Sequence, residues 1–163
     1  GNEKALNQLL AHHAVVFQPD KRLVWVSSNP YQLGEFTAYD LNKIFNDSIS
    51  NYMLNVDSLR IEKDKFVLSA DYSNYEKYRE QTHQISKLIK ENKKIDETFL
   101  TSYIQNNPDF WLVYDKVGDY YFQQKDYQQA SFYYKLALTK EVTTVPDRNK
   151  IQKKLSKCSR KTR

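Results

Sequence analysis

The chain has 163 residues, with 25 Lys and Arg against 20 Asp and Glu and a formal net charge of +5. This length allows one ordinary domain or two small ones, and a single cysteine excludes an intrachain disulfide. No apolar stretch approaches the roughly 20 residues that a membrane-spanning helix needs, and a high tyrosine content beside an ordinary charged fraction indicates a chain that folds.

A β-hairpin is predicted near the start of the chain. Residues 14–17 and 22–27 are rich in Val, Phe and Trp, which favour strands, and residues 18–21 between them contain Pro-Asp, which starts turns. Two strands alone are marginal in water, and residues 24–26 are apolar on both faces. The hairpin is therefore expected to belong to a larger sheet, and its unpaired edge predicts self-association of the isolated chain.

Helices are expected on both sides of this hairpin. One covers residues 2–12, and a short one covers residues 40–45, entered through residues 36–39. The leading Gly1, without an initiator methionine, is typical of a residue left after removal of a tag. The chain is therefore expected to be a carboxy-terminal fragment of a longer protein.

A linker over residues 46–74 separates two predicted domains. Within it, residues 59–61 and 65–68 are expected to form short extended pieces that cross the edge of the sheet. The predicted domains are residues 1–72, a sheet segment with its linker, and residues 73–163, a helical array with a basic tail.

The second half is predicted to hold five helices. The first covers residues 75–91, Asp96 caps the second, and Asp147 caps the last, while a hairpin over residues 111–142 supplies the other two. Residues 106–109, with a proline, end the second helix. The apolar positions are Tyr78, Ile85, Leu88 and Ile89 in the first helix, Phe99, Leu100, Tyr103 and Ile104 in the second, and Ile151, Leu155 and Cys158 in the last.

The hairpin at residues 111–142 carries two matching stripes separated by a polar break at residues 124–126. Gly118 costs about 1 kcal/mol in a helix interior relative to Ala, so a close neighbour is expected in the space that it leaves. The stripes are Tyr114, Val117, Gly118 and Tyr121 in one helix and Ala130, Tyr134 and Ala137 in the other.

This spacing resembles the 34-residue tetratricopeptide (TPR) repeat. Val142 stands where that family has its closing proline, and Pro146 follows four residues later, which suggests the end of an array. Residues 75–109 resemble a degenerate preceding unit, and the last helix resembles a capping helix. The resemblance implies a groove for a peptide or protein ligand, and the residues predicted near it are Tyr120, Tyr121, Lys125 and Tyr127.

Residues 8–46 resemble a second family. Their segments 12–19, 23–28, 30–34 and 36–41 are similar to the last sheet segment of bacterial relatives of acyl-CoA:6-aminopenicillanic acid acyltransferase. Those proteins are N-terminal-nucleophile (Ntn) hydrolases with an αββα sandwich, and some carry a helical extension. The resemblance therefore implies that an enzyme body, absent from this chain, precedes the sheet segment and is its partner.

The catalytic residues of that family have no counterpart here. Self-cleavage in the family exposes a cysteine, whose thiolate attacks an amide or thioester carbonyl while the free α-amino group acts as base. The one cysteine of this chain, Cys158, lies in a Lys/Arg-rich helix far from the sheet segment. No catalytic residue is therefore carried over, the chain is expected to be inactive by itself, and no cofactor is implied.

Other chemistry has weak signals. His12 and His13 are adjacent, and adjacent residues of a strand point to opposite faces, so no metal site is predicted, and His83 stands alone. The last sixteen residues hold eight Lys or Arg and no acid, but no nucleic-acid-binding motif accompanies them, and cations near a helix C-terminus complement its dipole. Nucleic acid is therefore not expected as a partner.

Two functions remain in view for an α+β, predominantly helical chain. In the first, the chain ends an Ntn-type acyltransferase or amide hydrolase, with the TPR-like helices as an accessory. In the second, it is a stand-alone TPR-like module for protein–protein interaction. The compartment stays open between the bacterial cell envelope and the cytoplasm, because a fragment would have lost any signal peptide.

Overall fold

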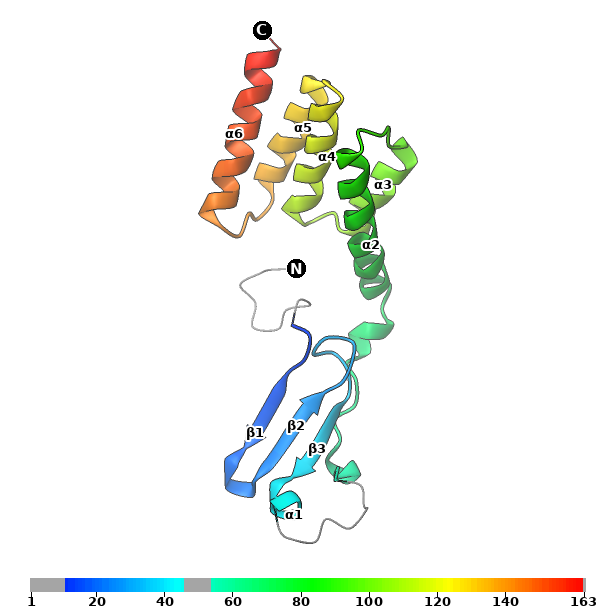
Figure 1. Cartoon of the computed structure of the whole chain (residues 1–163), viewed down its shortest axis with the longest axis vertical. Coiled ribbons are helices and arrows are strands. Elements are labelled where there is room, and N and C mark those ends of the chain that lie inside the picture. The colour runs from blue at the N-terminus through cyan, green and yellow to red at the C-terminus, as the bar shows by residue number, and fades with distance from the viewer. Residues whose placement is uncertain (1–10, 46–53, 163) are drawn as a thin grey trace. The chain divides into compact units, whose positions relative to one another are not determined.

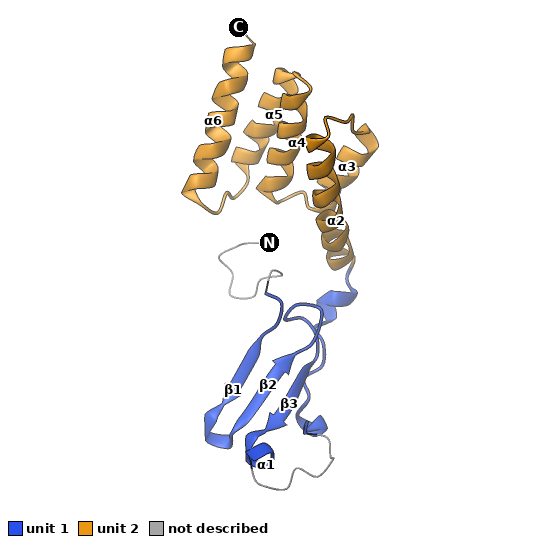
Figure 2. Ribbon diagram, in the orientation of Figure 1, with its two compact units in different colours: residues 1–69 blue, residues 70–163 orange. Residues whose placement is uncertain are grey.

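The computed structural model describes residues 11–45 and 54–162, which fall into two compact units (Figures 1 and 2). Unit 1 is residues 1–69 and unit 2 is residues 70–163, whereas the sequence placed the boundary after residue 72. The described part holds one antiparallel sheet in unit 1 and a set of longer helices in unit 2, so the coarse class, α+β with helices predominating, is confirmed. Almost all of the helix predicted over residues 2–12 lies outside the described residues.

The sheet has three strands in the order β1-β2-β3 (Figure 1). The predicted hairpin is β1 (Val15–Gln18) and β2 (Leu23–Ser27), joined by a short 3-10 turn, η1 (Pro19–Lys21). Residues 36–39 lead into the short helix as predicted, and they do so as part of a third strand, β3 (Phe36–Asp40), which was not predicted. Their Phe, Thr and Tyr side chains favour strands, and the free edge of β2 supplies the hydrogen-bonding partner. The short helix α1 (Leu41–Phe45) follows as predicted.

The linker covers the outer edge of β3. Ile61 pairs with Phe36 and Asn55 pairs with Tyr39, so the chain does cross the sheet edge as predicted. The segment contains η2 (Asp57–Leu59), whose last carbonyl accepts a hydrogen bond of 2.8 Å from the indole of Trp25. The extended piece predicted at residues 65–68 is wrong. It is a 3-10 helix, η3 (Lys65–Leu68), because the side chain of the preceding aspartate accepts a hydrogen bond from its backbone.

Unit 2 begins with the hairpin of α2 (Ala70–Lys90) and α3 (Glu97–Asn106). Helix α2 starts five residues before the predicted Tyr75, because the Asp, Ser and Asn that suggested a turn are tolerated in a first helical turn. Asp96 caps α3 as predicted, accepting a hydrogen bond of 3.1 Å from the backbone of Thr98. The two helices meet through a stacked pair of rings, Tyr78 and Tyr103, with centroids 5.5 Å apart.

The second hairpin is α4 (Trp111–Gln123) and α5 (Tyr127–Thr139), and its predicted stripes face each other. Gly118 is the point of closest approach. A Cβ atom built there would lie 2.6 and 2.7 Å from two ring carbons of Tyr134, so the expected close neighbour is this ring. Lys125 ends α4 in the left-handed conformation, with φ of 64°, and the backbone bonds from residues 125 and 126 back to 122 and 121 form a Schellman motif.

Helix α6 (Val145–Lys161) closes the unit, and it begins earlier than predicted. The prediction that Asp147 is its cap is wrong, because Thr144 caps the helix. The Thr144 hydroxyl accepts a hydrogen bond of 3.2 Å from the backbone N–H of Asp147 and donates one to the Asp147 carboxylate. Thr144 therefore acts as the N-cap, and its hydroxyl is held in place by the carboxylate of Asp147. Ile151 and Cys158 are buried as predicted.

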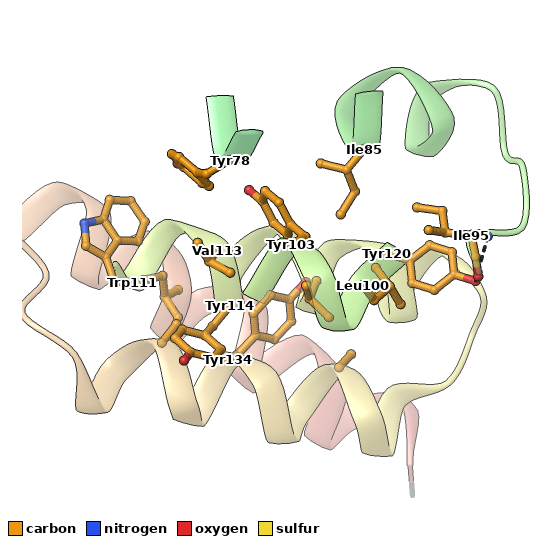
Figure 3. Packing of buried hydrophobic residues seen from close by; sticks show 14 of the residues in the cluster. Tyr78, Ile85, Ile95, Leu100, Tyr103, Trp111, Val113, Tyr114, Tyr120 and Tyr134 are labelled. Atoms are coloured by element: carbon orange, nitrogen blue, oxygen red, sulfur yellow. Dashed lines mark hydrogen bonds between the residues drawn. The ribbon is translucent and has the colours of Figure 1, made fainter. Parts of the chain in front are cut away.

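One continuous core connects all five helices of unit 2. It includes Tyr78 and Ile85 of α2, Leu100 of α3, and Ile151 of α6. Figure 3 shows aromatic side chains from α2, α3, α4 and α5 gathered in this cluster. Val142, at the position where a closing proline was expected from the resemblance, is itself buried in the core. The five predicted helices of residues 70–162 are therefore confirmed as one packed body.

The close approach of Gly118 to Tyr134 predicts whether replacing Gly118 by alanine stabilises or destabilises unit 2. In an open helix, Gly→Ala stabilises by up to about 1 kcal/mol. Here Gly118→Ala is expected to destabilise unit 2 by about 1–3 kcal/mol through overpacking, because the Tyr134 ring is 1% exposed and its hydroxyl is anchored on Asp119. Urea denaturation followed by circular dichroism measures the change.

The matched control is the same substitution in a Tyr134→Leu background, where removal of the ring should restore the ordinary stabilising sign. Gly118→Leu is a stricter form of the test, since its larger side chain must displace the ring. A Gly118→Leu variant as stable as the parent chain would contradict the close approach.

Candidate functional site

The predicted groove residue Tyr120 lies in the core. Its side chain is 6% exposed, and its hydroxyl both accepts a hydrogen bond from the backbone N–H of Ile95 and donates one to the carbonyl of the same residue (Figure 3). The prediction for Tyr120 is wrong, because this side of α4 packs against the loop between α2 and α3. A ligand has no access to this ring.

Tyr121 lies half-buried on a different side of α4. Its ring stacks on Tyr133 of α5 with centroids 5.4 Å apart and planes 3° from parallel, and its hydroxyl donates a hydrogen bond of 2.9 Å to Glu97 of α3. Burial, followed by the Glu97 carboxylate, raises the pKa of Tyr121. The residue therefore ties three helices together as a neutral phenol.

The other two groove residues lie near the turn between α4 and α5. Lys125 is exposed at the turn itself, and Tyr127 is half-buried, with its ring edge-on to Phe122 at 5.3 Å. Two shallow surface depressions, which follow α2 and α6 and are described below, are lined by none of these four residues. The structure therefore spreads Tyr120, Tyr121, Lys125 and Tyr127 over different environments instead of bringing them to one surface.

The most concentrated chemistry in unit 2 is an ion-pair network that joins α4, α5 and α6. The ammonium of Lys154 lies 2.7 Å from the carboxylate of Asp115 and 2.8 Å from that of Asp119. The hydroxyl of Tyr134 donates a hydrogen bond of 2.8 Å to Asp119, and the same ammonium lies 5.6 Å from the centroid of the Tyr134 ring. We call these four residues the Lys154 network.

Burial sets the electrostatics of this network. The side chain of Asp115 is 9% exposed, and burial raises its pKa although Lys154 pulls it down. Burial lowers the pKa of Lys154, but the two carboxylates raise it more, so the net shift is upward. Burial and the neighbouring carboxylates also raise the pKa of Tyr134. Lys154 is therefore held as a cation between its partners.

The charged groups of the Lys154 network are paired with one another. Each charged group already has a partner inside the cluster, so the arrangement holds helices together and offers no spare group to a substrate. Neither Lys154 nor either of its two carboxylate partners was predicted from the sequence as a site residue. The sequence did contain a signal for this network. Asp115 and Asp119 are four residues apart on one helix face, where two carboxylates repel each other unless a cation lies between them.

The remaining reactive side chains lie apart from one another. Cys158 is fully buried, and burial raises the pKa of its thiol, which keeps it protonated. His12 and His13 are exposed ahead of β1, and His83 is exposed on α2. Across residues 11–45 and 54–162, no group of three or more His, Cys, Asp or Glu is placed to hold a metal ion. Among these residues no helix is both long enough and apolar enough to cross a membrane.

Two shallow depressions of the described surface each follow one helix. The first is lined by residues of α6, and the second by residues of α2. The α6 depression is lined by Asn149, Gln152, Lys153, Ser156, Lys157 and Arg160, and the α2 depression by Ser73, Glu76, Lys77, Arg79, Glu80 and His83. Both depressions are open to solvent and neither is an enclosed site.

The Lys154 network predicts a pH-dependent loss of stability on substitution. Lys154→Met keeps the aliphatic stem but leaves the Asp115 carboxylate buried and unpaired, which is expected to cost about 3 kcal/mol at pH 7. Lys153→Met, at the neighbouring exposed position, is the control and is expected to change stability by less than about 0.5 kcal/mol. Urea denaturation of both variants measures the difference.

The sign of the pH dependence follows from Asp115. Its pKa is raised in the folded state, so the folded protein holds this proton more tightly than the unfolded chain, and this group adds stability as pH falls. Without Lys154 the pKa rises further. The stability gap between variant and parent should therefore narrow as pH falls through the raised pKa toward the ordinary aspartate value of about 3.9. A gap that is constant with pH would contradict the pairing.

Comparisons of the chain with protein-family models, with curated proteins and with solved structures find no match. They therefore assign the chain to no family. The function has to be argued from the surfaces of the two units, which are the open sheet of unit 1 and the helix faces of unit 2.

Proposed function

We propose that unit 1 is the last sheet segment of an Ntn-type acyltransferase or amide hydrolase, and that unit 2 is a TPR-like accessory region. In this proposal the sheet is a non-catalytic piece that completes a sandwich whose other strands, and whose nucleophilic cysteine, belong to the enzyme body. The observation that carries the proposal is the open apolar face of the three-stranded sheet.

That face is defined by the strand register. Val15 lies opposite Val26, and Phe17 lies opposite Val24, so the four side chains share one face of the sheet. The exposed fractions are 44% for Val15, 67% for Phe17 and 36% for Val26. A sheet in a folded protein normally packs its apolar face against a second layer. A facing sheet, as in an αββα sandwich, would cover this one.

The opposite face of the same sheet is already covered in part. Trp25 lies opposite Ala38, which is 1% exposed, and the indole of Trp25 is bonded to the linker at Leu59. Among the described residues, the linker covers this face only around Trp25 and Ala38, since Val16 on the same face is 48% exposed. The face with Val15 and Phe17 is exposed, which supports a role as one layer of a larger assembly.

The open edge of β1 supports the same role. Within the described residues β1 pairs only with β2, whereas β3 is paired on both sides by β2 and the linker. An exposed edge with apolar side chains is a place where another strand adds to a sheet. A strand of the enzyme body is the addition that the proposal expects.

The test is the composition of the native protein in its source cells. Antibodies against unit 2 would isolate the protein, and mass spectrometry would give its peptides and its intact mass. The proposal expects these peptides in one polypeptide, or one stable complex, with a body that begins at a cysteine freed by self-cleavage. A native protein without such a body would contradict it.

A charge on the open face is a second test in that native protein. Phe17→Lys would bury an ammonium without a partner under the facing sheet, and it is expected to destabilise the assembly by about 3 kcal/mol or more. Phe45→Lys is the control, since Phe45 is 78% exposed and lies in α1 outside this face. Thermal denaturation measures both. Equal stability of the Phe17 variant and the parent would remove the facing sheet from the proposal.

The alternative is that unit 2 alone is a protein–protein interaction module. The observation that favours it is the stacking of α2–α3, α4–α5 and α6 around one core, since repeat arrays bury each hairpin against the next and present a long surface to ligands. This alternative expects Phe17→Lys to leave the native protein unchanged, whereas substitutions on the helix faces would weaken capture of its partner.

A further inference from the structure

The outer face of α6 carries charge of one sign. Helix α6 holds seven Lys or Arg and one acidic residue, Asp147. Lys154 points inward to the two buried carboxylates, and Lys150 pairs with Asp147 at 3.4 Å. The residues on the side away from the core are the six exposed residues that line the α6 depression, which we call the α6 outer face: Asn149, Gln152, Lys153, Ser156, Lys157 and Arg160.

The first helix of the same array provides an internal comparison. The outer face of α2 mixes the two signs, with Glu76 and Glu80 beside Lys77 and Arg79, and Arg79 pairs with Glu76 at 3.5 Å. Helices at the two ends of an array need a polar outer face for solubility. Helix α2 meets that need with mixed charge, so solubility alone does not require the single sign on α6.

The single sign is locally unfavourable. Lys153 and Lys157 are four residues apart, Lys157 and Arg160 are three apart, and like charges at these spacings repel each other on a helix. The helix dipole compensates cations only in the last turn, which includes Arg160 but not Lys153. None of the three has an ion-pair partner among the described residues. A partner outside the chain would remove this repulsion.

We propose that the α6 outer face is a docking surface for an acidic protein segment that is rich in Asp and Glu. The rise of an α-helix places Lys153 and Lys157 about 6 Å apart along the axis, and Lys157 and Arg160 about 4.5 Å apart. Asp or Glu side chains at matching distances along the partner segment can pair with each cation. Asn149 and Gln152 precede Lys153 on the same face, and their side-chain amides can donate hydrogen bonds to the remaining carboxylate oxygens.

The same face suits other polyanions less well. Single-stranded nucleic acid is held by aromatic side chains that stack on its bases, and none of the six residues is aromatic. Stable attachment to an anionic bilayer combines cations with an inserted apolar side chain or an acyl chain, and none of the six is apolar. The chemistry of the face, ammonium and guanidinium groups alternating with amides and a hydroxyl, fits carboxylates on a second protein.

Binding of the full chain to fluorescein-labelled poly-L-glutamate, measured by anisotropy at low and at physiological salt, tests the proposal. Lys153→Gln/Lys157→Gln is expected to weaken binding about fivefold, since each exposed ion pair contributes modestly. The control Lys77→Gln/Arg79→Gln removes two charges from α2 and is expected to change affinity by less than about twofold. Circular dichroism checks that both variants stay folded.

Two competing probes complete the experiment. Oligothymidylate of equal charge and vesicles of phosphatidylserine and phosphatidylcholine are both expected to bind more weakly than poly-L-glutamate. The proposal is overturned if poly-L-glutamate does not bind, if the α6 and α2 variants weaken its binding equally, or if the oligonucleotide or the vesicles bind more tightly.

Discussion

The packing of unit 2 depends on one close contact, the ring of Tyr134 against the backbone of Gly118. The absent side chain at residue 118 lets α5 approach α4 until the ring lies where a Cβ atom would stand. That approach aims the Tyr134 hydroxyl at Asp119, which then shares Lys154 with Asp115. The close packing of α5 on α4 therefore positions the hydrogen bond from Tyr134 to Asp119. Asp119 in turn belongs to the ion-pair network that holds α6 against α4.

The two units solve the burial of apolar surface in different ways. Unit 2 closes its own core, with Val113, Val117 and Ala137 fully buried at the centre. In the described part of unit 1, Val15, Val16 and Phe17 remain exposed, because the linker covers the sheet only around Trp25 and Ala38. This difference is the physical basis for assigning the open sheet to a larger assembly and the helical array to an accessory or interaction role, both of which are proposals.

The basic residues of α6 in unit 2 lie in two different environments. Where a cation is buried, as at Lys154, two carboxylates face it and the pair acts within the fold. Lys153, Lys157 and Arg160 lie on the α6 outer face, and none of them forms an ion pair with an acid among the described residues. The position of each basic residue around α6 therefore decides whether its side chain faces a buried carboxylate or solvent.

The sequence alone predicted correctly those features that depend on residues close together in the chain. Three predictions rest on residues within a few turns of one another: the stripes that contain Tyr114, Gly118 and Tyr134, the cap at Asp96, and the break at residues 124–126. Periodicity of this kind predicts that a helix exists and which stripe it buries. It could not predict what lies opposite, and Tyr120 was therefore assigned to a groove although the loop between α2 and α3 covers it.

Tertiary structure decided the features whose partners are distant in the chain. Lys154 meets its carboxylates across 35 and 39 residues of sequence, and β3 is a strand because β2 offers it an edge to pair with. By itself the sequence determined the helices, the first hairpin and the stripe that packs them. Only the folded chain decided which faces meet, because a side chain's burial, charge state and partners are properties of the neighbours that folding brings to it.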